Sequence, residues 1–96
     1  MAQVELAEGA LADLDRLILT HSLPNDTRSR LRRSLTSLAR FPRLGPELRG
    51  RWRDFRFVLG PWRWMLIVYA YLEVEDRVVV VTIQDARSSA SATGSQ

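Results

Sequence analysis

Apolar positions in the first part of the chain recur with the period of an α-helix. Over residues 8–21, Leu11, Leu14 and Ile18 stand three and four positions apart. Such spacing gathers apolar side chains on one side of a helix. The pattern therefore predicts a first helix over residues 8–21. The preceding segment Gln3–Leu6 alternates between polar and apolar residues, which fits either a short first strand or the lead into this helix.

A second helical pattern follows over residues 26–40. Leu31, Leu35 and Leu38 form its apolar stripe. Pro42 disfavours helical geometry at Phe41, so the helix is expected to end there. Because only a few residues separate the two patterns, the helices are expected to form an antiparallel hairpin.

The second half of the chain changes to the pattern of β-strands. Residues 53–59 alternate between apolar and polar positions, residues 62–72 are apolar on both sides, and residues 78–83 are almost all β-branched. The first pattern is typical of a half-buried strand and the second of a central strand. Gly60-Pro61 and the polar residues 73–76 fall between them and predict turns. Residues 42–51 hold two prolines and two glycines, and we expect a loop there.

This order predicts an α+β fold. An N-terminal helical hairpin, with or without a short strand before it, packs on one face of a C-terminal antiparallel β-meander of three to four strands. A chain of 96 residues has the length of a single domain, which we assign to residues 1–87. The remaining residues 88–96, SSASATGSQ, have no apolar period and predict a flexible C-terminal tail.

Composition excludes several kinds of site. There is no cysteine, and His21 is the one histidine, so thiol nucleophiles, disulfides and multi-histidine metal sites are ruled out. No glycine-rich phosphate loop is present, and we expect neither a cofactor nor a metal. No apolar run approaches the ~20 residues of a membrane span, and the N-terminal residues lack the apolar core of a signal peptide. We therefore expect a cytoplasmic protein with no membrane partner.

Charge is distributed unevenly along the chain. All the basic side chains are arginines, and the formal net charge is +3. Residues 1–20 carry −3, residues 21–63 carry +8 and residues 64–96 carry −2. A GC-rich genome suffices to explain arginine in place of lysine, but every guanidinium can still bind phosphate through two hydrogen bonds. A basic middle flanked by acidic ends indicates an anionic partner.

The arginines divide into two groups. Those of the second predicted helix fit a solvated face that the acidic first helix partly neutralises. The others surround the predicted hairpin, where a charge inside a strand must face solvent or find a partner. If the strands pair as predicted, Arg56, Arg63 and Arg87 converge on the sheet face that the helices leave open, with Asp54 and Asp85 as candidate partners. A phosphate clamp and a structural ion-pair network both fit this arrangement.

The aromatic residues have two interpretations. Trp52 and Trp62 could stack on bases or pack in the core, whereas Trp64 shares the parity of Leu66 and Val68 and is expected in the core. Tyr69 and Tyr71 share the parity of Arg63, so each could hydrogen-bond a phosphate or a 2′-hydroxyl, or be an ordinary half-buried tyrosine. His21 falls in the turn between the helices and is expected to be a solvated helix-end residue.

Four segments, taken in order, carry a family resemblance. They are VELAEGALADLDRL (residues 4–17), LARFPRLGPELRG (38–50), DFRFVLGPWRWMLIVYAY (54–71) and RVVVVTIQDARS (77–88). With these segments the chain resembles the RelE/ParE family of toxins from type II toxin–antitoxin modules, over about residues 3–88. The resemblance implies a cytoplasmic toxin that a cognate antitoxin inactivates with a helix or an added strand.

The resemblance leaves two mechanisms open. RelE-like members enter the ribosomal A site and cut mRNA, whereas ParE-like members poison DNA gyrase and are not nucleases. A third alternative is an inactive relative that only binds a partner. The partners implied beyond the antitoxin are thus the ribosome and mRNA, or gyrase.

On the RelE-like reading the resemblance points to specific residues. Arg63 matches the arginine that opens the family's third strand, while Arg56 and Arg87 stand near further basic positions. With Asp85 these are the predicted catalytic residues, and the predicted nucleic-acid contacts are Arg49, Arg51, Arg53 and Trp62. The lysines and the C-terminal tyrosine of typical RelE-like nucleases have no counterpart. Asp85, Tyr69 or Tyr71 would then have to transfer protons, which arginine does not do near neutral pH. The ParE-like reading needs no such residue.

Overall fold

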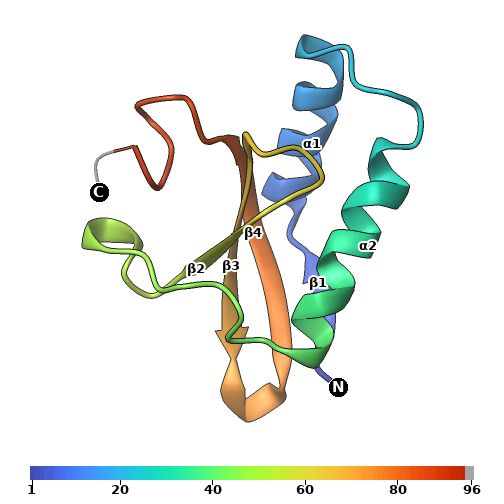
Figure 1. The fold of residues 1–96 in the computed structure, drawn as a ribbon. Coiled ribbons are helices and arrows are strands. Elements are labelled where there is room, and N and C mark those ends of the chain that lie inside the picture. Colours follow the sequence, from blue (N-terminus) through green and yellow to red (C-terminus); the bar gives the residue numbers. More distant parts are fainter. Residues whose placement is uncertain (95–96) are drawn as a thin grey trace.

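A four-stranded sheet carries two helices on one of its faces (Figure 1). The computed structural model describes residues 1–94. The elements are β1 (Gln3–Leu6), α1 (Glu8–Thr20), α2 (Thr27–Arg40), β2 (Arg56–Leu59), β3 (Met65–Leu72) and β4 (Arg77–Asp85), with short 3₁₀ turns at Gly50–Trp52 and Glu73–Glu75. The strand order is β1-β4-β3-β2. Strands β2, β3 and β4 form the predicted antiparallel meander, and β1 pairs parallel to β4. The predicted α+β fold is confirmed, and the short N-terminal segment is a strand.

Both helices lie within one residue of their predicted bounds. The buried residues Leu31, Leu35 and Leu38 confirm the apolar stripe of α2. In α1 the side chains that reach the core are Leu14 and Leu17, whereas Leu11, which was expected in the stripe, is 45% exposed. Within residues 1–94, no helix is both long and apolar enough to cross a bilayer.

Two strand boundaries differ from the prediction. Strand β2 begins at Arg56, because residues 50–54 form tight turns. Strand β3 begins at Met65 and not at Trp62, since the Met65 N–H closes a turn on the Trp62 carbonyl at 2.9 Å. The hairpin between β2 and β3 therefore has a loop over residues 60–64. Arg63 had been predicted to lie in a strand, but it lies in this loop.

A bulge in β4 lies next to the polar contacts that this strand makes with α1. Val68 pairs with Thr82 and Tyr69 with Val80, so that Val81 is the extra residue. The Asp13 carboxylate of α1 accepts the Ile83 N–H at 3.2 Å and the Thr82 hydroxyl at 2.5 Å. This carboxylate thus joins α1 to β4 one and two residues beyond the bulge.

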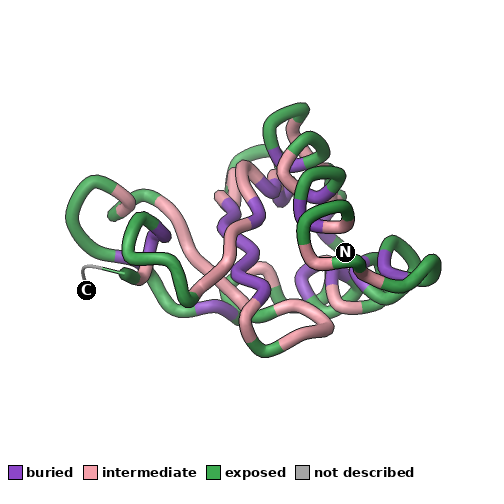
Figure 2. The backbone as a smooth tube through the Cα atoms, turned by 90° about the horizontal axis from the view of Figure 1, so that it is seen from above, coloured by how far each residue is buried: buried purple, intermediate pink, exposed green. Residues whose placement is uncertain are grey.

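Both faces of the sheet are covered. The helices pack on Met65, Ile67 and Tyr69 of β3, and on neighbouring residues of β4. On the other face, Leu66 and Val68 pack with Leu48 and Ala92. Figure 2 shows the buried strands between the helices and the loop segments on the far side. The expectation of an open sheet face is wrong, because a central strand that is apolar on both sides needs a cover on both sides.

The segment after β4 supplies part of that second cover. Ser91 and Ala92 are buried, and the Ala92 N–H donates to the Gln84 side-chain oxygen at 2.7 Å. Within the segment predicted to be a flexible tail, residues 91–92 are thus packed against the sheet, whereas residues 88–90 and 94 are exposed. Residues 95–96 of that prediction lie outside the described residues. The domain boundary after residue 87 and the mobility of the tail stay predictions.

Candidate functional site

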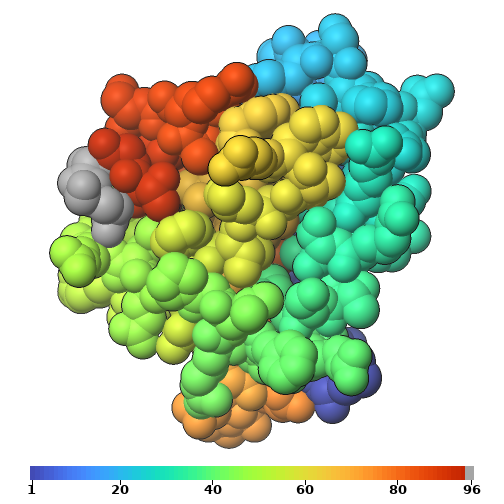
Figure 3. Space-filling view, in the orientation of Figure 1, coloured from blue at the N-terminus to red at the C-terminus, as the bar shows by residue number. Residues whose placement is uncertain are grey.

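The start of β3 and the end of β4 bring two loops together. Met65 pairs with Asp85, and the Ala86 N–H donates to the Trp64 carbonyl at 2.7 Å. The C-terminal end of α1 reaches the same place, and the surface view shows these three segments meeting on one face (Figure 3). We call His21, Trp64, Asp85 and Arg87 the sheet-end cluster.

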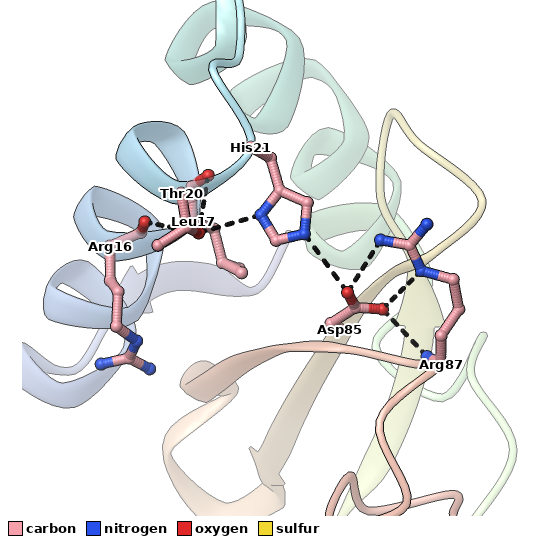
Figure 4. Close-up of polar contacts among 6 residues, drawn as sticks. All are labelled: Arg16, Leu17, Thr20, His21, Asp85 and Arg87. Carbon is pink, nitrogen blue, oxygen red and sulfur yellow. Dashed lines mark hydrogen bonds and ion pairs between the residues drawn. The ribbon is translucent and has the colours of Figure 1, made fainter.

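Asp85 and Arg87 form the charged centre of this cluster. The Arg87 side chain donates from Nε to Asp85 Oδ1 at 2.9 Å and from Nη2 to Asp85 Oδ2 at 2.8 Å (Figure 4). The Arg87 backbone N–H adds a third bond to Oδ1. The Arg87 side chain therefore holds the pKa of the Asp85 carboxyl well below its usual range, and contributions from the Arg87 backbone N–H and from His21 act in the same direction. A carboxylate held this way stays ionised and is a poor proton acceptor.

His21, the residue that follows α1, completes the cluster. Its Nε2 lies 3.3 Å from Asp85 Oδ2, and its Nδ1 lies 3.0 Å from the Thr20 hydroxyl. The imidazole stacks on Trp64 with ring centroids 4.4 Å apart and 15° between the planes. The Arg87 guanidinium carbon lies 5.1 Å from the centroid of the same indole. An ionised carboxylate only accepts hydrogen bonds, so the hydrogen between His21 and Asp85 is on Nε2.

The sequence interpretation missed His21 as a site residue. A turn between two helices is an ordinary place for a solvated histidine, and 64 positions separate His21 from Asp85. Trp64 was assigned by strand parity to the face of Leu66 and Val68. It precedes the strand, so parity does not apply, and it packs instead against the helix-side core. No local signal in the sequence would have joined these two residues.

Arg63 lies beside the cluster and is free to bind. It is exposed in the loop before β3, and it has no hydrogen bond or ion pair with any of residues 1–94. Its neighbour Trp62 is half-buried against the helix-side core, with the Arg30 guanidinium carbon 5.5 Å from its ring centroid. Arg63 and Arg87 therefore lie at one end of the sheet, whereas the prediction had placed them on an open sheet face.

Arg56 does not join them. It pairs across the sheet with Tyr69, four residues and roughly 13 Å along β3 from Met65. Its Nη1 donates to the Gly45 carbonyl at 2.8 Å and its Nη2 to Glu47 at 3.1 Å. Only 22% of the side chain is exposed. The convergence of three arginines is thus incomplete, and Arg56 serves the fold of the loop before β2.

The two tyrosines that could have moved protons are engaged. Tyr69 is fully buried and donates to the Pro42 carbonyl at 2.8 Å. Burial raises the pKa of its hydroxyl. Tyr71 donates to Asp76 at 2.8 Å, and this bond raises its pKa. Neither hydroxyl belongs to the sheet-end cluster.

The remaining predicted nucleic-acid contacts gather elsewhere. Arg49, Arg51 and Arg53 are exposed on and beside the 3₁₀ turn Gly50–Trp52. Arg49 and Arg51 line a hollow of about 290 Å³ between this turn and residues 89–91. The hollow is basic but holds no proton-transfer group. Among residues 1–94, no three potential ligands are grouped closely enough to hold a metal ion.

The family described as "ParE toxin of type II toxin-antitoxin system, parDE" matches residues 4–89. The chain belongs to the RelE/ParE family of toxins. No curated protein matches it in sequence.

Solved structures of this toxin family share the fold. The intact RelBE toxin–antitoxin complex of E. coli contains a chain with a TM-score of 0.68 and 20% identity, covering 92% of this toxin and 100% of that chain. The isolated E. coli RelE toxin gives 0.67 and 21%, covering 94% and 89%. The RelBE2 complex of Mycobacterium tuberculosis gives 0.60 and 20%, covering 88% and 96%. At such low identity the likeness extends to the fold alone.

Proposed function

We propose that this toxin is neutralised by a cognate antitoxin and that it stops growth by cutting mRNA on the ribosome. The observation that carries the proposal is the sheet-end cluster with Arg63 beside it. Arg87, the fixed Asp85 carboxylate and the Trp64 indole lie together, and the exposed Arg63 directly precedes Trp64. The two guanidinium groups of this set can bind a phosphodiester.

Cleavage requires charge stabilisation more than any cofactor. When a ribose 2′-hydroxyl attacks the adjacent phosphate, negative charge builds on the phosphoryl oxygens. Arg63 and Arg87 are the groups that would stabilise this charge. Asp85 holds Arg87 in a fixed orientation, so little reorganisation is needed when the substrate binds.

The basic hollow supports binding to a large polyanion. Arg49, Arg51 and Arg53 carry their charge on a different part of the surface from the cluster. Contacts of this kind add affinity without sequence preference. We assign them to the RNA of the ribosome, outside the cleaved site.

An apolar groove supports the antitoxin partner. The groove, of about 460 Å³, lies between β1 and the two helices and is lined by Val4, Leu6, Leu11, Leu14, Arg28, Leu31, Arg32, Leu35, Thr36 and Ala39. Strand β1 is an edge strand, and an edge strand can accept an added strand. Two of the similar structures are themselves described as toxin–antitoxin complexes. We propose an apolar antitoxin segment with acidic residues opposite Arg28 and Arg32.

Ribosomes programmed with a defined mRNA test the cleavage. Purified toxin should cut the message in the A-site codon, and addition of the antitoxin should stop the reaction. The Arg63→Ala variant should cut at least about tenfold more slowly, since one transition-state contact is lost. Intact mRNA at a large excess of toxin would contradict the proposed mechanism.

Inhibition of DNA gyrase is the second candidate. It is favoured by the absence from the sheet-end cluster of a tyrosine or carboxylate free to transfer protons, and by the match to the ParE description. A supercoiling assay that shows inhibited gyrase and stabilised cleavage complexes would support it. Normal growth on expression without antitoxin would contradict both mechanisms and support an inactive relative.

A further inference from the structure

We propose that His21 is the proton-transfer residue of the sheet-end cluster, accepting the 2′-hydroxyl proton on Nδ1. This inference rests on the proposed cleavage of mRNA, and it supplies the group which that reaction lacked. Its basis is the placement of a single imidazole between a fixed carboxylate and an accessible surface.

The hydrogen bond to Asp85 fixes the imidazole in the required form. Because the Asp85 carboxylate accepts from Nε2, the lone pair of the neutral ring is on Nδ1. A carboxylate behind an imidazole also stabilises the imidazolium that forms when the ring takes a proton. Stacking on Trp64 holds the ring plane, so the direction of the lone pair is set before substrate binds.

The Nδ1 atom has a polar contact that a substrate hydroxyl can replace. Its contact within residues 1–94 is the exposed Thr20 hydroxyl at 3.0 Å. That hydroxyl has another acceptor, the Arg16 carbonyl at 2.9 Å, so it can leave Nδ1 without losing its own bond. The His21 side chain is 27% exposed and that of Arg87 is 63% exposed. A ribose hydroxyl can therefore take the place of Thr20.

Arg87 binds the same Asp85 carboxylate as His21 and keeps unused hydrogen-bond donors. Its Nε and one Nη2 hydrogen bind Asp85. The two Nη1 hydrogens have no acceptor among residues 1–94, which leaves them for a phosphoryl oxygen. Base and cation are thus held by the same carboxylate, which fixes their spacing.

The proposed cleavage needs no reactant other than the RNA and solvent water. The 2′-oxygen forms a bond to phosphorus while its proton passes to His21 Nδ1. The bond from phosphorus to the 5′-oxygen breaks, and that oxygen takes a proton from solvent water. The products are a 2′,3′-cyclic phosphate and a 5′-hydroxyl. The imidazolium then returns its proton to solvent.

The charged surroundings of His21 come from two elements. Asp85 of β4 contacts the ring, and Arg87, which follows β4, pairs with Asp85. On α1, the Asp13–Arg16 ion pair lines a neighbouring hollow that Asp85 also lines. We expect the cleavage rate to rise with pH and then to level off, as in reactions that depend on a general base.

Single-turnover cleavage on programmed ribosomes at several pH values tests the proposal. His21→Gln should slow cleavage by about 10²- to 10⁴-fold, the usual contribution of a general base, and should abolish the rise with pH. His21→Ala should regain activity when imidazole is added. The matched control is Thr20→Val, which removes the other hydrogen-bond partner of the ring and should stay within about threefold of wild type. Thermal unfolding of each variant shows that it is folded.

The outcomes separate this inference from the proposed function. Active wild type with a His21→Gln variant that cuts within about threefold of it would overturn the inference alone. Slow cleavage with an unchanged pH profile and no rescue by imidazole would show that His21 is only structural, and would also overturn it. Wild-type protein that cuts no mRNA would overturn the proposed function, and the inference with it.

Discussion

The Tyr69 hydroxyl accepts the Gly45 backbone N–H at 3.0 Å. It also donates to the Pro42 carbonyl, so one buried side chain from the middle of the sheet holds both ends of a loop turn. An unpaired buried polar group costs about 1–3 kcal/mol. We therefore expect Tyr69→Phe to lower the free energy of unfolding by that amount, as measured by urea denaturation. Because Tyr69 lies outside the sheet-end cluster, toxicity per folded molecule should not change. Loss of activity without loss of stability would contradict this structural role.

Gly45 itself tolerates no side chain. A Cβ placed there would lie 2.1 Å from the Phe57 carbonyl oxygen, which is backbone and cannot move aside cheaply. Gly45→Ala should therefore destabilise the toxin by about 1–3 kcal/mol. Gly9→Ala is the control, because the nearest atom to its Cβ would be at 3.6 Å and alanine favours a helix. Urea midpoints that fall equally for both variants would argue against a tight contact at Gly45.

Acid should remove the contribution of Asp85 to stability. Its pKa is lowered in the folded chain, chiefly by the Arg87 side chain, so the unfolded chain binds more protons as the pH falls. The stability from this group is therefore present at neutral pH and is lost progressively below about pH 5. In the Asp85→Asn variant, the side chain at this position neither gains nor loses a proton in this pH range. The difference in unfolding free energy between wild type and Asp85→Asn should shrink between pH 7 and pH 3, and a constant difference would contradict the assignment.

Arg56 and Arg63 should behave differently although the sequence grouped them. Arg63→Ala should relieve toxicity and leave the free energy of unfolding within about 0.5 kcal/mol of wild type, as for other exposed sites. Arg56→Ala should lower stability by about 1–3 kcal/mol, because the Gly45 carbonyl loses a charged donor. Growth after induction and urea denaturation measure the two effects.

The control for both is Arg33→Ala, which removes an equal charge from the exposed face of α2. It should change neither toxicity nor stability. If Arg33→Ala relieved toxicity as much as Arg63→Ala, net charge and not position would be the cause. If Arg63→Ala were strongly destabilised, Arg63 would have to be removed from the site.

Periodicity predicted those parts of the fold in which neighbours in sequence decide the structure. The stripe of Leu31, Leu35 and Leu38 gave the second helix, and the β-branched run gave β4. Parity failed at Arg63 and Trp64, because the hairpin loop extends to the residue before Met65. The alternation of side chains between the two faces of a sheet does not continue through a turn, so it predicts nothing there when the length of the turn is unknown.

The site was predictable only in part, for a related reason. Asp85 and Arg87 are two positions apart and their ion pair is local. His21 and Trp64 reach the same place through the packing of α1 on β4 and through the hairpin loop. The second cover of the sheet, from Leu48 and Ala92, comes from two segments without any period. Tertiary contacts of this kind leave no pattern in the sequence.

The groove beside β1 gives a prediction for the antitoxin. Leu11 is 45% exposed and lines this groove, whereas Leu19 is 80% exposed on the same helix and does not line it. Leu11→Asp should weaken antitoxin binding by at least about tenfold, since a charge would be buried under an apolar segment. Leu19→Asp makes the same chemical change outside the groove and should bind as wild type does. Titration calorimetry of each variant with the antitoxin measures the effect. Wild-type affinity in both variants would show that the antitoxin binds elsewhere, whereas a loss of affinity in both would indicate a contact that extends along the whole exposed side of α1.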